Sequence, residues 1–261
     1  MENSNIYSTN IQSIIQAHYI DPQSKLDKYS ELLDTNKSII LKNRLKNKNN
    51  HTVLALMLKD DILYLKIKSF DLDTAHVVRK YILRYRFKAK GLILDLRNNP
   101  GGLLMKAIEI GDYFVDDSIV LKAVGRDEKD LTIYKTYTYN TLTTVPIVVL
   151  VNKYTISAAE ILAGILQDKK RAILIGERTF GKTSIQDLIP VDNDKILKLT
   201  TERYYFSSGE DITGKGLLPD IDIKNRKIIK YRNITLSQKL KIMDIKSKNR
   251  DYALLVSKAL L

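Results

Sequence analysis

The sequence predicts an α/β fold in which short buried strands alternate with amphipathic helices. Two continuous apolar runs, at residues 92–96 and 146–151, have the length and composition of strands buried on both faces of a parallel sheet. Each run is followed by a polar or glycine-containing turn and then by apolar residues at helical spacing. A strand, a crossover helix and a second strand in this order are the unit from which parallel sheets are built.

The composition is that of a globular protein. Of the 261 residues, 44% are hydrophobic and 28% are charged, which is enough apolar material for a full core. No cysteine is present, so disulfides, thiol catalysis and thiolate metal sites are excluded. The net charge of +13 is compatible with polyanion binding, but the lysines are scattered and no nucleic-acid motif is found, so nucleic acid is not an expected partner.

The first 52 residues are expected to form a helical and linker segment. Apolar spacing predicts a helix over residues 7–20, a second short helix over 25–33, and a polar basic linker over 42–50. The beginning of the chain lacks the basic start and apolar core of a signal peptide. No run of about 18 apolar residues occurs, so no transmembrane segment is predicted.

From residue 53 the pattern changes to alternating strands and helices. Strands are predicted at 53–58, 61–68, 92–96, 118–124 and 131–139, and helices at 72–87 and 103–114. Further along, strands are predicted at 188–191 and 195–206 around the pair Asp192-Asn193. The segment 236–261 is expected to be a helical tail.

The segment 145–186 contains the most informative residues. It is interpreted as a strand at 146–151, a polar turn, a helix at 157–167 and a second strand at 172–176. Ser157 therefore falls where a strand passes into a helix, next to free N–H groups and the positive end of the helix dipole. Taken alone, Ser157 is an ordinary helix N-cap and Lys182 an ordinary surface charge.

Together with their neighbours, these residues resemble a known family. The run Ser-Ala-Ala-Glu-Ile begins at Ser157, the run Thr-Phe-Gly-Lys ends at Lys182, and Gln186 follows. This pattern and its spacing are similar to those of the carboxyl-terminal processing peptidases, which are Ser/Lys-dyad serine proteases. The resemblance implies that Ser157 is the nucleophile and Lys182 the general base, with Gln186 positioning the lysine.

The chemistry accounts for these residue types. A serine hydroxyl is a poor nucleophile until a neighbouring base takes its proton. The three histidines lie well upstream, at His18, His51 and His76. Lysine can serve as the base only when neutral, which requires burial to lower its pKa from about 10.4. Gln186 would hold the neutral amine by a hydrogen bond without adding charge.

The turn at residues 95–102, Asp-Leu-Arg-Asn-Asn-Pro-Gly-Gly, is a second candidate site. Consecutive glycines permit backbone angles and close approaches that other residues do not allow, and a helix follows. The same family has a similar segment that supplies an N–H to the oxyanion hole. The resemblance therefore implies that Gly101 or Gly102, together with the N–H of Ala158, stabilises the tetrahedral intermediate.

The resemblance covers residues 63–223, including the segment Lys-Gly-Leu-Leu-Pro-Asp that starts at Lys215. It implies an α/β core of the ClpP/crotonase type with additional strands and with helical N- and C-terminal appendages. The expected organisation is an N-terminal segment at 1–52 without a complete PDZ domain, a catalytic core at 53–223 and a tail at 224–261.

The resemblance also carries expectations about cofactors, partners and location. No metal or other cofactor is expected. Substrates would be proteins with apolar C-terminal tails, and a homo-oligomer is possible. The resemblance implies an extracytoplasmic location, whereas the lack of a signal peptide favours the cytoplasm if the chain is complete.

Two alternatives remain open from the sequence. Bulky residues at 153–156 and Thr183 stand where the family has small residues and glycine, which is compatible with an impaired homologue that binds extended peptides by strand addition. Residues 176–183 also satisfy the nucleotide-binding pattern G-x-x-x-x-G-K-[ST] after a strand. Against that reading, the next residues alternate like a strand, whereas this motif should open into a helix.

Overall fold

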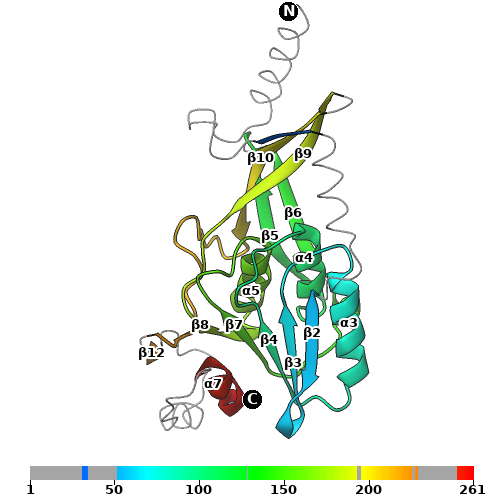
Figure 1. Cartoon of the computed structure of the whole chain (residues 1–261), viewed down its shortest axis with the longest axis vertical. Helices are drawn as coiled ribbons and strands as arrows, with labels where there is room; N and C mark the ends of the chain where they lie inside the picture. The colour runs from blue at the N-terminus through cyan, green and yellow to red at the C-terminus, as the bar shows by residue number, and fades with distance from the viewer. Residues whose placement is uncertain (1–30, 35–51, 128, 193–194, 225–226, 229–251) are drawn as a thin grey trace, which may run out of the picture. The chain divides into compact units, whose positions relative to one another are not determined.

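The computed structural model describes residues 31–34, 52–127, 129–192, 195–224, 227–228 and 252–261 (Figure 1). The chain divides into two compact units. The larger unit comprises residues 48–120, 134–182 and 206–261, and the smaller one comprises residues 1–47, 121–133 and 183–205.

A seven-stranded sheet forms the centre of the larger unit, in the order β12-β11-β8-β7-β4-β3-β2. Its strands are β2 (Val53–Met57), β3 (Ile62–Ile67), β4 (Gly91–Asp95), β7 (Ile147–Val151), β8 (Ala172–Gly176), β11 (Ile221–Asp222) and β12 (Lys227–Ile228). The five inner strands are parallel, and β2 and β12 are antiparallel at the edges. Every residue of β4 and β7 is buried, which explains their continuous apolar sequences.

Helices cover both faces of this sheet (Figure 1). They are α3 (Thr74–Tyr85), α4 (Leu104–Asp112), α5 (Ala158–Asp168) and α7 (Tyr252–Leu260). On one face α3, α4 and α5 pack in sequence, and the first nine residues of α5 are all buried. On the other face, α7 inserts Ala253, Val256 and Leu260 against apolar side chains of the strands.

Because the five inner strands are parallel, all their carboxyl ends lie along one side of the sheet, called here the carboxyl-end edge, and their amino ends lie along the opposite edge. The loops at residues 96–103 and 152–157 follow the carboxyl ends of β4 and β7, so they lie at the same edge. The segment at residues 86–90 precedes β4 and lies at the opposite edge, next to the short 3₁₀ turn Lys59–Asp61. Candidate site residues at 95–102 and 157 therefore share the carboxyl-end edge.

The smaller unit contains a five-stranded sheet with the order β1-β10-β5-β6, in which β9 also pairs with β10. The strands are β1 (Glu31–Asp34), β5 (Ser118–Val124), β6 (Leu131–Thr136), β9 (Ser184–Asp192) and β10 (Lys195–Phe206). Within it, Leu197, Leu199 and Tyr204 are buried.

Most predicted elements are confirmed, with three corrections. The helix predicted over residues 25–33 is wrong at its end, because residues 31–34 form β1 and pair antiparallel with β10. This long-range pairing overrides a helical preference that spans only a few residues. The strand predicted over 131–139 ends at Thr136, and a 3₁₀ turn, Thr138–Asn140, follows.

Several predictions lie outside the described residues. These are the helix at 7–20, the linker at 42–50, residue 193 of the expected turn, and residues 236–251 of the tail helix. The tail expected at 224–261 is helical at α7, but residues 227–228 form strand β12, which pairs antiparallel with β11, so the prediction of a helical tail is wrong there. Within the described ranges, no helix has the length and apolarity needed to cross a membrane.

Candidate active site

Ser157 sits in a strained turn between β7 and α5. The turn is closed by a hydrogen bond from the Thr155 N–H to the Asn152 carbonyl (2.8 Å), and the Thr155 hydroxyl donates to the Leu96 carbonyl (3.0 Å). Ser157 has φ 55° and ψ −119°, whereas an ordinary N-cap has extended backbone angles. Such a conformation costs a non-glycine residue about 1–3 kcal/mol and persists only where the surroundings hold it. The simple N-cap interpretation does not account for this geometry.

The carboxylate of Glu160 holds the backbone of Ser157 and of Lys182 at one place. Glu160 lies in the first turn of α5 and is fully buried. Its Oε2 accepts the N–H of Ser157 and the N–H of Lys182, each over 2.9 Å. Its Oε1 accepts the Thr179 hydroxyl and the Gly181 N–H, each over 2.6 Å. One buried group therefore fixes the serine turn and the lysine loop together.

A backbone contact adds to this connection. The Phe180 N–H donates to the Thr155 carbonyl over 3.2 Å, so the lysine loop runs beside the serine turn. Lys182 itself is half-buried. The structure thus brings the two predicted catalytic residues to neighbouring loops of the same unit.

Gly101 lies directly against the serine turn. A Cβ placed on Gly101 would stand 2.9 Å from the Ser157 Cβ and 3.1 Å from the Ala158 nitrogen. The φ of Gly101 is +98°, an angle that favours glycine. Its N–H is already used, because it donates to the Asn99 side-chain oxygen over 2.8 Å. Asn99 is fully buried, and its carbonyl accepts the N–H of Ile156 (3.0 Å).

Gly102 has an N–H that no group in the described part of the chain accepts. Its neighbours are tied to Phe70, because the Phe70 N–H donates to the Gly101 carbonyl and the Leu103 N–H donates to the Phe70 carbonyl, each over 2.9 Å. The N–H of Ala158, at the beginning of α5, likewise has no acceptor among the described residues. Of the two candidate glycines, only Gly102 keeps its backbone donor available.

A buried ionic cluster fixes the base of the glycine turn. Asp95, at the end of β4, is fully buried and accepts a two-point contact from the Arg97 guanidinium, at 2.9 and 2.7 Å. The Tyr64 hydroxyl donates to the same carboxylate over 2.6 Å. Burial disfavours the charged form of Asp95, but the hydrogen bonds from Arg97 and Tyr64 outweigh it, and the pKa of Asp95 is lowered. Burial, followed by the bond to Asp95, raises the pKa of Tyr64.

The substitution Asp95→Asn tests the contribution of this cluster to the unfolding free energy and the dependence of that contribution on pH. A carboxyl group whose pKa is lowered by folding contributes stability that is present above its unfolded pKa of about 3.8 and is lost as pH falls through the folded value. We expect Asp95→Asn to lose about 2 kcal/mol of unfolding free energy at pH 7. The loss should be smaller at pH 3, as measured by urea unfolding at both values. An equal loss at pH 3 and pH 7 would contradict this account.

The remaining predicted residue, Gln186, lies on β9 of the smaller unit, opposite Thr200 of β10. Its role beside Lys182 stays a prediction.

Three residues that sequence reasoning left without a role are Asp95, Asn99 and Glu160. For Glu160 a signal existed, because Ser-x-x-Glu before an apolar helix is a capping-box pattern.

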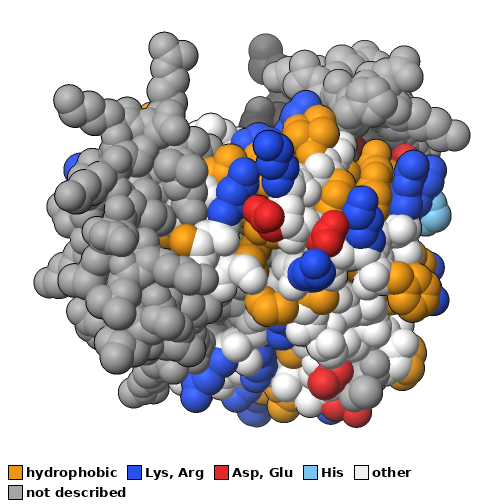
Figure 2. All heavy atoms as spheres, turned by 90° about the horizontal axis from the view of Figure 1, so that it is seen from below, with side chains coloured by type: hydrophobic (Ala, Val, Ile, Leu, Met, Phe, Trp, Pro, Cys, Tyr) orange, Lys and Arg blue, Asp and Glu red, His pale blue; other side chains and the backbone are white. Residues whose placement is uncertain are grey.

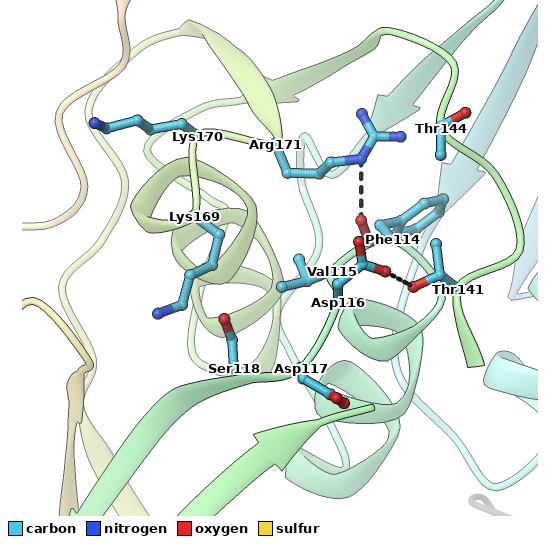
Figure 3. A pocket seen from close by; sticks show the side chains of 10 residues that line it. All are labelled: Phe114, Val115, Asp116, Asp117, Ser118, Thr141, Thr144, Lys169, Lys170 and Arg171. Atoms are coloured by element: carbon cyan, nitrogen blue, oxygen red, sulfur yellow. Dashed lines mark hydrogen bonds between the residues drawn. The ribbon is translucent and has the colours of Figure 1, made fainter. Parts of the chain in front are cut away.

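A cavity of about 470 Å³ lies at the other end of α5 (Figure 3). Its lining residues are Phe114, Val115, Asp116, Asp117, Ser118, Thr141, Thr144, Lys169, Lys170 and Arg171. Figure 3 shows the Arg171 side chain reaching the Phe114 carbonyl (3.0 Å), and it also donates to the carbonyls of Thr143 and Val145. Arg171 thus joins backbone segments, and none of the predicted site residues lines this cavity.

The nucleotide-binding alternative does not agree with the structure. The residues after Thr183 form strand β9, whereas a phosphate-binding loop of this type opens into a helix. The N–H groups of Gly181 and Lys182 donate to the Glu160 carboxylate. A carboxylate at this position would repel a phosphate, so the loop is not a phosphate cradle.

The parallel sheet and the strained turn place Ser157 at the carboxyl ends of the strands of an α/β core. Comparison with protein families gives the class of protein: the chain belongs to peptidase family S41, whose model matches residues 61–223. This confirms the resemblance seen in the sequence. It also confirms the predicted α/β core of the ClpP/crotonase type.

Individual relatives agree with this assignment. The chain is 41% identical over 153 residues to a carboxy-terminal-processing protease of Bartonella bacilliformis, covering 58% of this chain and 35% of that protein. It is 37% identical over 171 residues to the carboxy-terminal processing protease CtpA of Bacillus subtilis, covering 65% and 36% respectively. The chain therefore spans about a third of the length of the curated relatives it matches.

Solved structures share the fold. A photosystem II D1 C-terminal processing protease matches with a TM-score of 0.59 and 29% identity, covering 66% of this chain and 48% of that one. A lipoprotein from Streptococcus agalactiae matches with a TM-score of 0.62 over 84% of this chain and 91% of its own, at 19% identity. The second likeness concerns the fold alone.

Proposed function

We propose that this chain is a serine endopeptidase that cleaves proteins near their C-termini through a Ser157/Lys182 dyad. The observation that carries the proposal is the double contact of Glu160, whose single oxygen Oε2 receives the N–H groups of both residues. A helix cap alone would require only the contact to Ser157. The second contact, across 22 positions of the chain, serves to hold the lysine loop beside the serine.

In this mechanism the Ser157 hydroxyl attacks the scissile carbonyl carbon while the neutral amine of Lys182 takes its proton. The protonated lysine then returns that proton to the leaving amine, and the acyl group stays on Ser157. A water molecule, deprotonated by the same lysine, releases the acyl group and restores the serine. Gln186 is proposed to orient the amine, as the family resemblance implies.

The negative oxygen of the tetrahedral intermediate would be held by the N–H groups of Gly102 and Ala158. Both donors are available among the described residues, whereas the Gly101 N–H is engaged by Asn99. The Ala158 donor also lies at the positive end of α5. Loss of one such donor typically raises the barrier by about 3–4 kcal/mol.

Gly101→Ala is expected to lower kcat by about a hundredfold. The added methyl group would meet the Ser157 Cβ at 2.9 Å and would displace the nucleophile and the Ala158 donor. Steady-state cleavage of a fluorogenic peptide measures the effect. Gly209→Ala is the matched control, because Gly209 also has a positive φ but has open space around it. Equal activity of the two variants would contradict the proposed contact.

Exposed apolar side chains next to the site support an apolar substrate tail. Phe180 is 57% exposed and stands two residues before Lys182, and Tyr154 is 54% exposed and stands three residues before Ser157. Met105, in the helix that follows the glycine turn, is 57% exposed. Large apolar groups in contact with water around a site are available for an apolar ligand.

The test is cleavage of an unfolded protein that ends in an apolar tail, compared with the same protein ending in a charged tail. We expect cleavage of the first and little of the second, and labelling of Ser157 by a serine-reactive fluorophosphonate, located by mass spectrometry. Absence of both cleavage and labelling would reject the peptidase proposal. Tail binding without cleavage would instead indicate the impaired homologue.

A further inference from the structure

The end of α3 and the turn after it concentrate positive charge. Between Thr74 and Lys90 the sequence contains no acidic residue and carries six lysines and arginines. Basic runs without acidic residues also occur at residues 37–48 and 224–241, but most of their positions lie outside the described structure. We define the α3 basic patch as the exposed residues Lys80, Arg84, Arg86, Phe87, Lys88 and Lys90.

The patch is held in a fixed position by the fold. The opposite face of α3 is buried through Ala75, Val78 and Ile82, so Lys80 and Arg84 share the outward face at a spacing of one helical turn. After the helix, the N–H groups of Lys88 and Ala89 both donate to the Tyr85 carbonyl (2.9 and 2.8 Å). The hydrogen-bonded turn carries Arg86, Phe87 and Lys88 at its tip. These positions belong to well-packed structure and not to a free tail.

The charges of the patch are largely uncompensated. Lys90 pairs with Asp61 over 3.0 Å. Within the described residues, Lys80, Arg84, Arg86 and Lys88 form no ion pair. Figure 2 shows the face seen from below, where blue Lys and Arg side chains stand among orange hydrophobic ones, with some red Asp and Glu side chains between them. This surface presents a positive field that suits an anionic partner.

Phe87 gives the patch a second property. Its side chain is 91% exposed, the highest exposure among the large apolar residues of the described structure. The Arg86 guanidinium lies 4.4 Å from the centre of its ring. A ring exposed to water contributes nothing to the hydrophobic core. The neighbouring cation interacts with its face, and transfer of the ring into an apolar environment would be favourable.

We propose that the α3 basic patch docks the protein on the surface of a membrane containing anionic phospholipids. The cations would contact lipid phosphates, and the Phe87 ring would enter the boundary between headgroups and acyl chains. Basic side chains beside an exposed aromatic residue are the combination that binds such an interface. No segment of the chain needs to cross the bilayer.

Nucleic acid fits the same charges less well. Single-stranded nucleic acid is bound along a basic groove in which several aromatic rings stack successive bases. Here one ring is fully exposed, and a guanidinium already lies over it. The other aromatic residues of the segment, Tyr81 and Tyr85, are only half-exposed. A single aromatic tip surrounded by cations matches a lipid surface better than a stacking groove.

The experiment is co-sedimentation of the full chain with vesicles of phosphatidylcholine, alone or mixed in equal parts with phosphatidylglycerol. We expect binding to the mixed vesicles only, with a strong decrease at high salt. Phe87→Ser and the double change Arg86→Glu with Lys88→Glu should each weaken binding by about tenfold or more. The matched control is Lys215→Glu with Lys224→Glu, which makes the same charge change at two exposed lysines elsewhere.

Each outcome decides between the readings. A control variant that loses as much binding as the patch variant would show that only net charge matters, and this overturns the proposal. Equal binding to neutral and anionic vesicles, or no binding, overturns it as well. If the protein binds a fluorescent single-stranded oligonucleotide more tightly than it binds the anionic vesicles, and the Phe87→Ser variant loses that binding, the patch would be assigned to nucleic acid. Circular dichroism checks that every variant is folded, and hydrolysis of a soluble peptide should be unchanged by Phe87→Ser.

Discussion

Replacement of Ser157 by alanine is expected to abolish peptide cleavage, with kcat lowered by a factor on the order of 10⁴ or more. The reason is that the hydroxyl forms the acyl intermediate, and no other group in the proposed mechanism can replace it. Folding should be unaffected, because alanine removes one oxygen of a half-buried residue and leaves the Ser157 N–H contact to Glu160 in place. Cleavage of a fluorogenic peptide measures the rate, and thermal unfolding checks the fold.

Lys182 is expected to behave as the partner of Ser157. Lys182→Ala should lower kcat by a similar factor, and the double variant should be no worse than either single one, because the two residues act as a unit. Lys182→Arg is the sharper change, since a guanidinium keeps positive charge but cannot give up its proton near neutral pH. An inactive arginine variant therefore separates proton transfer from simple charge.

Lys224→Ala is the matched control, because Lys224 is exposed and far along the chain from the lysine loop. Its activity should equal that of the unchanged protein. Substantial cleavage by Lys182→Arg would contradict a lysine base. Substantial cleavage by Ser157→Ala would remove the nucleophile from the proposal altogether.

Glu160→Gln is expected to produce the second large effect. Four donors meet the carboxylate, three of them backbone N–H groups, and an amide would turn its own N–H₂ toward two of these donors. A buried donor left without an acceptor costs about 1–3 kcal/mol, so we expect a loss of about 3–5 kcal/mol in unfolding free energy. The serine turn and the lysine loop would separate, and kcat should fall by about a thousandfold.

Two measurements keep this prediction testable if the variant is unstable. Activity is compared at a temperature where circular dichroism shows the variant to be folded, and the fluorophosphonate reaction with Ser157 is timed separately. Glu109→Gln is the control, because Glu109 also accepts two side-chain donors but is partly exposed on α4. It should change stability by about 1 kcal/mol or less. A folded Glu160→Gln variant with normal activity would show that the bridge does not organise the site.

The fold was largely predictable because its strands are unusual in composition. β4 and β7 are buried on both faces, so their sequences are continuously apolar and easy to recognise. Helices α3 and α5 were found from their spacing and their turn residues. β1 was missed because it is short and is stabilised by a partner strand more than 160 residues away, which no local pattern reveals.

The candidate site was predictable in its residue types but not in its connections. Ser157, Lys182 and the two glycines were found from motifs, since each lies in a local sequence pattern. The role of Glu160 depends on its approach to Thr179 and Lys182, which only the folded chain brings about. The choice between Gly101 and Gly102 depends in the same way on one hydrogen bond from Gly101 to Asn99.

The parallel strands separate the glycine turn from the α3 basic patch by the length of β4, five residues or about 17 Å. A protein bound to a bilayer through Phe87 would therefore hold the loops with Ser157 and the glycine turn away from the lipid. The C-terminus of a substrate held close to the membrane would not reach Ser157, whereas a C-terminus joined to the membrane by a longer segment would reach it. The direction of the strands would thus select substrates by the distance of their C-termini from the membrane surface.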